Sequence, residues 1–160
     1  MANVTGIRFN RAGKIYYFEA GDIALAAADD ANALIHRTAE IDRIAGVITD
    51  GITGRFDYAG QLAGGFSKDR GAVYEALEMW LDYWRDLLLV KLGSEATVTN
   101  IDRKQELTET ADGYRPGQIK EFIESIRRTA EQLRQNVNPR LALEVLMLDI
   151  PIKGGGATNG

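Results

Sequence analysis

The chain has 160 residues, of which 45% are hydrophobic and 26% charged, a composition typical of one soluble globular domain. Its net charge of -4 disfavours tight binding of nucleic acid by this chain alone, because domains that hold the phosphate backbone usually carry a basic excess. There is no cysteine and a single histidine, His36, which excludes disulfides and thiolate chemistry and leaves too few ligands for a zinc site.

The apolar runs of the sequence are far too short to span a bilayer. The N-terminus lacks the basic region and the long apolar run of a signal peptide. We therefore expect a cytoplasmic protein with no membrane partner.

The first twenty residues read as a β-hairpin. Two β-rich runs, residues 7–9 and 14–19, flank "NRAG", which is a plausible turn. An isolated hairpin is marginal in water, so this one needs something to pack on.

From about Asp22 the pattern becomes helical. Residues 30–50 place apolar side chains along one helical stripe, namely Leu34, Ile41, Ile44, Ala45 and Ile48. His36 lies in this pattern, and we interpret it as an exposed or half-buried helix residue rather than a catalytic base. Gly51 and Gly54 are expected to break the helix, and a short segment from Arg55 to Leu62 follows, with Phe56 and Ala59 as inward candidates.

The strongest helix is predicted from Lys68 to Leu92, with Ser67 as its cap and Gly93 as its stop. Its apolar stripe consists of Val73, Leu77, Trp80, Leu81, Trp84, Leu87, Leu88 and Leu92. The charged residues of this helix lie mainly off that stripe; they are Glu75, Glu78, Asp82, Arg85 and Asp86. Three of them, Glu75, Glu78 and Asp82, are interpreted as a solvated outer face. Trp80 and Trp84 share one face, which suits either a core or an interface between subunits.

The segment "ATVTNID" is expected to form an extended connection, followed by a weaker helix over residues 103–110. Pro116 marks the start of the next helix. Its stripe is clean and consists of Ile119, Phe122, Ile123, Ile126, Ala130, Leu133 and Val137.

The last predicted helix is capped by Asn138 and has Pro139 at its first position. Unlike a surface helix with one apolar stripe, it is apolar on nearly every side. Its apolar residues are Leu141, Ala142, Leu143, Val145, Leu146, Met147, Leu148 and Ile150. The glycine-rich tail, residues 153–160, is expected to be disordered. The sequence thus predicts an all-α helical bundle over residues 21–152, preceded by the hairpin of residues 1–20.

Three glycine clusters invite a phosphate-binding reading: residues 12–14, 60–65 and 154–160. None has the spacing of a phosphate loop, so we expect no nucleotide and no other cofactor. The carboxylates of the strongest helix and the mixed charges of the later helices are interpreted as solvated surface. No catalytic, cofactor-binding or metal-binding residue is predicted, and we expect no enzymatic activity.

The stretches "ALEMWLDYWRDLLLVKLG", "VTNID" and "QLRQNVNPRLALEVLMLDIP", in this order, resemble the C-terminal collar domain of the bacterial DNA polymerase III delta-prime subunit. The resemblance extends back through "RFDYAGQLAGGFSKDR" and, more weakly, to about Leu25. It implies a non-catalytic oligomerisation domain that supports sliding-clamp loading in DNA replication. The gamma/tau and delta subunits would be its partners, with DNA contacted only through the complex.

The resemblance also suggests why the last helix is apolar on nearly every side, since one face would pack in the bundle and another would meet a neighbouring subunit. The residues predicted to serve in the core or the interface are Trp80, Trp84, Leu88, Phe122, Ile126, Asn138, Pro139, Arg140, Leu143 and Met147. A complete subunit of this kind has an ATPase-type module ahead of the collar, and this chain shows no phosphate loop, zinc-binding cysteines or arginine-finger segment.

The beginning, "VTGIRFNRAGKIYYFEAGD", resembles the start of a different family, the polymerase-suppressor-type domain of small regulatory proteins. We therefore hypothesise a fusion of two gene ends, natural or arising in sequence assembly. An alternative function is a small cytoplasmic regulatory protein that binds its partner through the hairpin.

Overall fold

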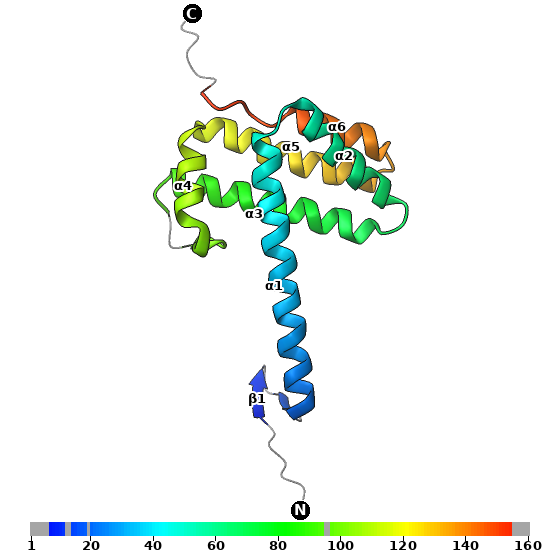
Figure 1. Ribbon diagram of the computed structural model, residues 1–160, viewed down its shortest axis with the longest axis vertical. Helices are drawn as coiled ribbons and strands as arrows, with labels where there is room; N and C mark the ends of the chain where they lie inside the picture. Colours follow the sequence, from blue (N-terminus) through cyan, green and yellow to red (C-terminus); the bar gives the residue numbers. More distant parts are fainter. Residues whose placement is uncertain (1–6, 12–13, 19, 95–96, 155–160) are drawn as a thin grey trace, which may run out of the picture. The chain divides into compact units, whose positions relative to one another are not determined.

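The computed structural model describes the backbone of residues 7–11, 14–18, 20–94 and 97–154, and side chains from residue 28 onward (Figure 1). The chain divides into two compact units, residues 1–39 and 40–160. The predicted boundary between residues 20 and 21 stays a prediction, and the tail beyond residue 154 lies outside the described residues.

The first unit contains two strands and the beginning of a helix. Strand β1 (Ile7–Arg11) pairs with β2 (Lys14–Phe18) in antiparallel register, with Ile7 opposite Phe18 and Arg11 opposite Lys14. The turn between them lies outside the described residues. Helix α1 (Ala20–Thr49) begins in this unit and continues into the second.

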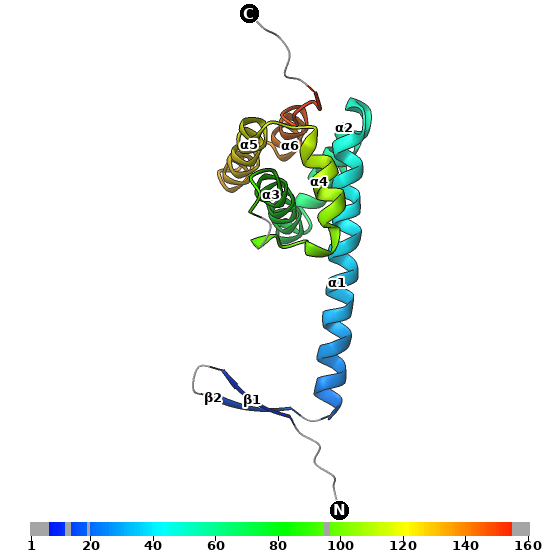
Figure 2. The same cartoon turned by 90° about the vertical axis from the view of Figure 1, so that its left-hand side faces the viewer.

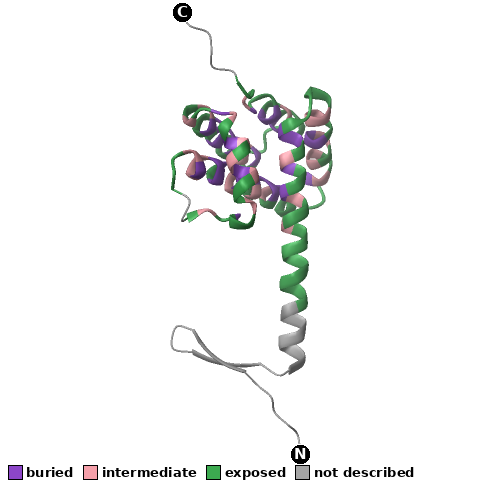
Figure 3. Cartoon of the chain, turned by 60° about the vertical axis from the view of Figure 1, so that its left-hand side comes forward, coloured by how far each residue is buried: buried purple, intermediate pink, exposed green. Residues whose placement is uncertain are grey.

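The described side chains of α1 in the first unit are exposed, apart from the half-buried Arg37 (Figure 3). Leu34, which its spacing places on the same helical stripe as Ile41 and Ile44, is 64% exposed. The stripe becomes buried only from Ile41 onward, where the second unit surrounds it. An apolar stripe predicts burial only where another element covers it.

The second unit is a helical bundle, which confirms the predicted fold class for this part of the chain. It consists of the end of α1 together with α2 (Ile52–Phe66), α3 (Arg70–Lys91), a 3-10 helix (Ile101–Arg103), α4 (Lys104–Asp112), α5 (Pro116–Arg134) and α6 (Pro139–Leu148). Helix α2 packs on α6 and α3, and α3 packs on α4 and α5. Helix α5 runs opposite to α3 and to α6 (Figure 1), and α3 and α5 are seen almost end-on in Figure 2.

An aromatic cluster lies at the centre of the bundle. The rings of Trp84 and Phe122 are 4.6 Å apart between centroids, and Trp80 and Tyr114 contact this pair at 6.0 and 5.3 Å. Trp80 also donates its Nε1–H to the Tyr58 hydroxyl at 2.8 Å. Both tryptophans are completely buried, so within this chain they serve the core rather than an exposed surface.

Helix α2 is longer than the predicted segment of residues 55–62. It runs through Gly54, where a break was expected, and Gly51 is its N-cap instead. Glycine costs about 1 kcal/mol relative to alanine inside a helix. The burial of Tyr58, Ala59 and Phe66 on the inner face of α2 outweighs that cost.

Helix α3 begins two residues later than predicted because its cap is a different residue. The Asp69 side chain accepts the Ala72 N–H at 3.0 Å, whereas Ser67 is the last, capping residue of α2. Leu92 and Val137, both placed on buried stripes by the sequence, are 55% and 37% exposed. Each lies beyond the last residue of its helix, where the helical spacing no longer sets the direction of the side chain.

Asp86, which the helical spacing places off the apolar stripe of α3, is completely buried. Its carboxylate accepts the Thr99 N–H at 3.0 Å, the Asn100 N–H at 2.8 Å and the Asn100 side-chain amide at 2.7 Å. Asp86 thus fixes the connection between α3 and the 3-10 helix that leads into α4. A carboxylate is tolerated in the interior when hydrogen-bond donors satisfy it.

Candidate interaction surface

Helix α6 has two apolar faces, and only one of them is covered. Its inner face is buried against α2 and α5 and consists of Ala142, Leu143, Leu146 and Met147. On the other side, Leu141, Val145 and Leu148 are 59%, 46% and 56% exposed. Their spacing of four and three residues puts them on one helical face. We call these three residues the outer stripe.

The sequence sets α6 firmly in place at its start. Asn136 adopts a left-handed backbone with a φ of 59°, a conformation that asparagine tolerates better than most residues, and the chain turns there after α5. The Asn138 Oδ1 accepts the Leu141 N–H at 3.1 Å, and Pro139 occupies the first turn. Arg140 and Glu144 form an ion pair at 2.8 Å beside the outer stripe.

The ten predicted core or interface residues differ in their burial. Those that are buried are Trp80, Trp84, Phe122, Ile126, Leu143 and Met147. Leu88 and Pro139 are half-buried, while Asn138 and Arg140 are exposed. The sequence did not single out the outer stripe among the apolar residues of this helix, because its periodicity alone cannot tell which of two apolar faces the bundle covers.

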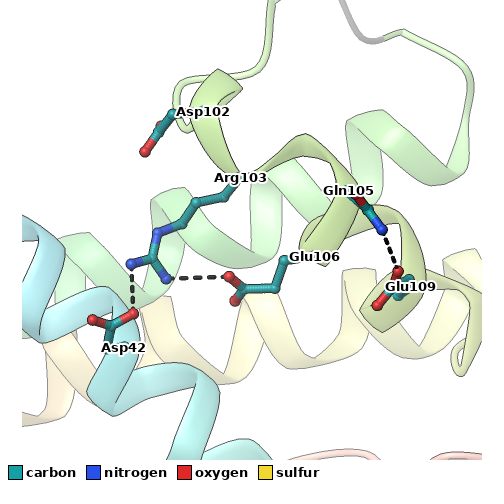
Figure 4. A pocket seen from close by; sticks show the side chains of 6 residues that line it. All are labelled: Asp42, Asp102, Arg103, Gln105, Glu106 and Glu109. Atoms are coloured by element: carbon teal, nitrogen blue, oxygen red, sulfur yellow. Dashed lines mark hydrogen bonds and ion pairs between the residues drawn. The ribbon is translucent and has the colours of Figure 1, made fainter.

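An acidic pocket lies where the end of α1 meets α4. Arg103 points into it and bridges Asp42 of α1 at 2.5 Å and Glu106 of α4 at 3.2 Å (Figure 4). Burial opposes the guanidinium charge, but the hydrogen bond to Asp42 and the charge of Glu106 outweigh it and raise the pKa of Arg103. We interpret the pocket as a structural contact in which Arg103 links α1 to α4.

The tyrosines with raised pKa values are explained by packing. Burial is the main cause for Tyr58, Tyr83 and Tyr114, and it raises the pKa of Tyr83 to about 12. Tyr58 donates to Glu40 at 2.9 Å and so joins α2 to α1. Tyr83 lies 3.5 Å from Glu106 and joins α3 to α4 in the same way.

The other motifs considered from the sequence are also accounted for where the structure describes them. Residues 60–65 lie inside α2 and form no phosphate loop. Glu75 and Glu78 are exposed and Asp82 is half-buried. Among the described residues there is no group of three or more histidine, cysteine or carboxylate side chains placed to hold a metal ion. Nor does any helix in the described part combine the length and apolarity needed to cross a bilayer.

Comparison with known families adds the decisive observation. Residues 59–151 match the family described as "DNA polymerase III, delta subunit, C terminal", which is more than half of the chain. The chain belongs to this family. The match begins within α2, includes α3 to α6 in full, and therefore contains the whole outer stripe. No curated protein and no solved structure matches the chain.

Membership of this family confirms part of the predicted resemblance: the domain is related to the clamp loader of DNA polymerase III. The strands β1 and β2 and helix α1 lie outside the matched residues. The resemblance predicted for the first twenty residues therefore stays a prediction.

Proposed function

We propose that this chain is a non-catalytic association domain of the bacterial DNA polymerase III clamp loader, of the delta-prime collar type. Its partners are the collar domains of the gamma/tau and delta subunits, and it contacts DNA only through the assembled complex. It supports the loading of the sliding clamp and, as part of a bacterial replication complex, acts in the cytoplasm.

The observation that supports this function is the two-sided apolar character of α6. Its inner face completes the bundle, while the outer stripe exposes three large aliphatic side chains in a row. Single exposed aliphatic residues are ordinary, but a contiguous row on a rigid helix is typical of a contact surface. Burying the exposed halves of these side chains contributes roughly 1 kcal/mol each before the cost of association.

The choice of delta-prime over other subunits rests on the order of the sequence stretches that resemble that subunit. Three of them coincide with structural elements: the strongest helix with α3, "VTNID" with the connection held by Asp86, and the "NPR" start with the cap of α6. The non-catalytic part of the proposal is supported by the interpretation of Arg103 and the buried tyrosines as packing contacts.

The direct test is light scattering on a size-exclusion column, with the chain alone and mixed with gamma/tau and delta subunits. We expect a stable mixed complex, and Val145→Asp should weaken it by about tenfold or more because it places a charge in the contact. The matched control is Ile101→Asp, since Ile101 is an aliphatic residue of the 3-10 helix that is at least as exposed as Val145, at 60% against 46%.

Two results would count against the proposal. One is the absence of any complex at micromolar concentration, which would leave a folded domain without the assembly role. The other is an equal loss of binding in Val145→Asp and Ile101→Asp, which would remove the outer stripe from the contact.

A further inference from the structure

The chain that follows α6 continues to the turn that joins α4 to α5 (Figure 1). Helix α6 finishes at Leu148, Ile150 is buried, and Pro151 prevents the helix from continuing. We call residues 151–154 the strap. Because α5 runs opposite to α6, the α4–α5 turn lies at the same end of the bundle as the end of α6 (Figure 1).

Two contacts hold the strap on the α4–α5 turn. The Gly154 N–H donates to the Gly113 carbonyl oxygen at 3.1 Å. The stem of Lys153 passes so close to Gly113 that a Cβ there would lie 3.0 Å from the Lys153 Cγ and 3.1 Å from its Cδ. Glycine at position 113 therefore leaves the room that the lysine stem occupies.

Tyr114 connects the strap to the interior of the bundle. This residue is 3% exposed, and its ring centroid lies 5.3 Å from that of Trp84. The Lys153 ammonium lies over the same Tyr114 ring, 6.0 Å from its centroid, at the outer limit of a cation–π contact. Tyr114 thus contacts Trp84 of the core and Lys153 of the strap at the same time.

Helix α6 is fixed at both ends by parts of the chain that lie outside it. At its start, the Asn138 Oδ1 accepts the Leu141 N–H, and a short connection leads back to α5. At its end, the strap begins shortly after Leu148. Because Leu148 belongs to the outer stripe, the strap also holds the end of that stripe in place.

The contacts of the strap are few enough for it to open while the bundle stays folded. Among residues 151–154 no side chain is fully buried, and Ile152 is 75% exposed. Opening therefore uncovers little apolar surface, and segments of this kind open locally at a small part of the global free energy of unfolding. Gly154 has a φ of 74°, which glycine adopts without strain and other residues avoid.

We propose that residues 151–154 open and close on the α4–α5 turn and thereby control how firmly the last turn of α6 is held. With the strap closed, Leu148 is fixed in line with Leu141 and Val145, and the outer stripe is complete. With the strap open, the last turn of α6 frays and the stripe loses its end. The effect on the stripe rests on the proposed function, in which the stripe is the contact surface.

The strap variant combines Lys153→Ser, which removes the stem beside Gly113, with Gly154→Ala, which strains the backbone at a φ of 74°. The matched control combines Lys68→Ser with Gly93→Ala. Lys68 is exposed and Gly93 has a φ of 72°, so the control changes the same residue types and the same charge outside the strap and the α4–α5 turn.

Hydrogen exchange of the full chain, resolved by residue with NMR, measures the opening directly. In the unaltered chain, the Gly154 amide should exchange at least about tenfold more slowly than an unstructured amide, because it is bonded to Gly113. In the strap variant, the Asp149 amide, which bonds to the Val145 carbonyl at 3.1 Å, should exchange at least about threefold faster. The control should leave the Asp149 rate unchanged.

Lys153→Met separates the two roles of the lysine, because it keeps most of the stem and loses the charge. We expect its Asp149 exchange rate to stay close to that of the unaltered chain. A Lys153→Met chain as loose as the strap variant would overturn the role given to the stem.

Three results would overturn the strap itself. One is a Gly154 amide that exchanges as fast as an unstructured one in the unaltered chain. Another is a strap variant whose Asp149 amide exchanges at the unaltered rate. The third is a control that loosens the end of α6 as much as the strap variant does.

Binding to gamma/tau and delta tests the effect on the outer stripe. We expect the strap variant to bind about threefold more weakly, in proportion to the fraction of open strap, and the control to bind as the unaltered chain does. Unchanged binding in a strap variant with faster exchange would overturn the effect on the contact. A chain that binds neither subunit would lose the proposed function, while its exchange rates would still decide the strap.

Discussion

At the scale of single residues, Trp84 is the most exacting test of the bundle. It is completely buried between Phe122 and Tyr114, with centroid distances of 4.6 and 5.3 Å. Trp84→Ala should lower the free energy of unfolding by roughly 3–5 kcal/mol, because it removes a large buried ring and leaves a cavity. Urea unfolding followed by circular dichroism measures this change.

The Trp84 indole N–H has no hydrogen-bond partner among the described residues, which gives the control. Trp84→Phe loses no hydrogen bond and less volume, so its cost should be clearly smaller than that of the alanine variant. An alanine variant that costs under about 1 kcal/mol would contradict the burial of this side chain.

Tyr83 predicts how stability changes in alkaline solution. Burial is the main cause that raises the pKa of Tyr83 to about 12. The hydrogen bond to Thr110 lowers this pKa, and the nearby Glu106 raises it. An unfolded tyrosine ionises near pH 10. The stabilising contribution of neutral Tyr83 is thus complete below pH 10 and is lost as the pH rises from 10 towards 12.

Between pH 10 and 12, the free energy of unfolding should therefore fall by about 2 kcal/mol less in Tyr83→Phe than in the unaltered chain. The measurement is a series of urea unfolding curves between pH 8 and 12. Parallel profiles for the two proteins would show that Tyr83 does not contribute to the alkaline loss of stability.

At the scale of elements, the start of α6 separates two kinds of helix signal. Asn138 makes the capping hydrogen bond to the Leu141 N–H, whereas Pro139 supplies only a favourable backbone angle. Asn138→Ala should therefore cost about 1 kcal/mol, and Pro139→Ala distinctly less. Thermal unfolding of both variants measures the difference, and a severe loss in Pro139→Ala would mean that the helix does not begin there.

The sequence predicts the helices best where apolar spacing and burial agree. The stripe of α5 from Ile119 to Leu133 is buried apart from the half-buried Ala130, because two neighbouring helices cover it. The stripe of α1 fails at Leu34, where helical spacing continues without a covering element. Helical periodicity describes one element, whereas burial depends on a second one that the pattern does not contain.

Asp86 shows a different limit of sequence reasoning. Its charge and its position off the apolar stripe both indicate solvent, yet it is buried by the Thr99 and Asn100 donors. Those donors approach it only after the chain has folded back, so no local pattern reveals them. The same applies to the outer stripe of α6: the sequence shows a helix that is apolar all round, and only the packing of α2 and α5 shows which side remains open.

At the scale of the whole molecule, the core and the family match lie in the same part of the chain. The buried apolar residues of the bundle begin at Ile41, and the matched region covers residues 59–151. The recognisable stretches of sequence were informative because they include both the tryptophans of the core and the cap of α6. The hairpin lies outside the matched region, and its predicted role is therefore the one most in need of a test.

Deleting residues 1–20 separates the two functions considered for this chain. If the bundle is the association domain, the shortened protein should keep its melting temperature within about 4 °C and bind gamma/tau and delta as the full chain does, because its core and outer stripe are retained. A regulatory protein that acts through the hairpin would instead lose its partner while the bundle stays folded. Calorimetry and light scattering on the same samples distinguish the two cases, and Val145→Asp in the full chain provides the reciprocal variant, with the hairpin present and the stripe broken.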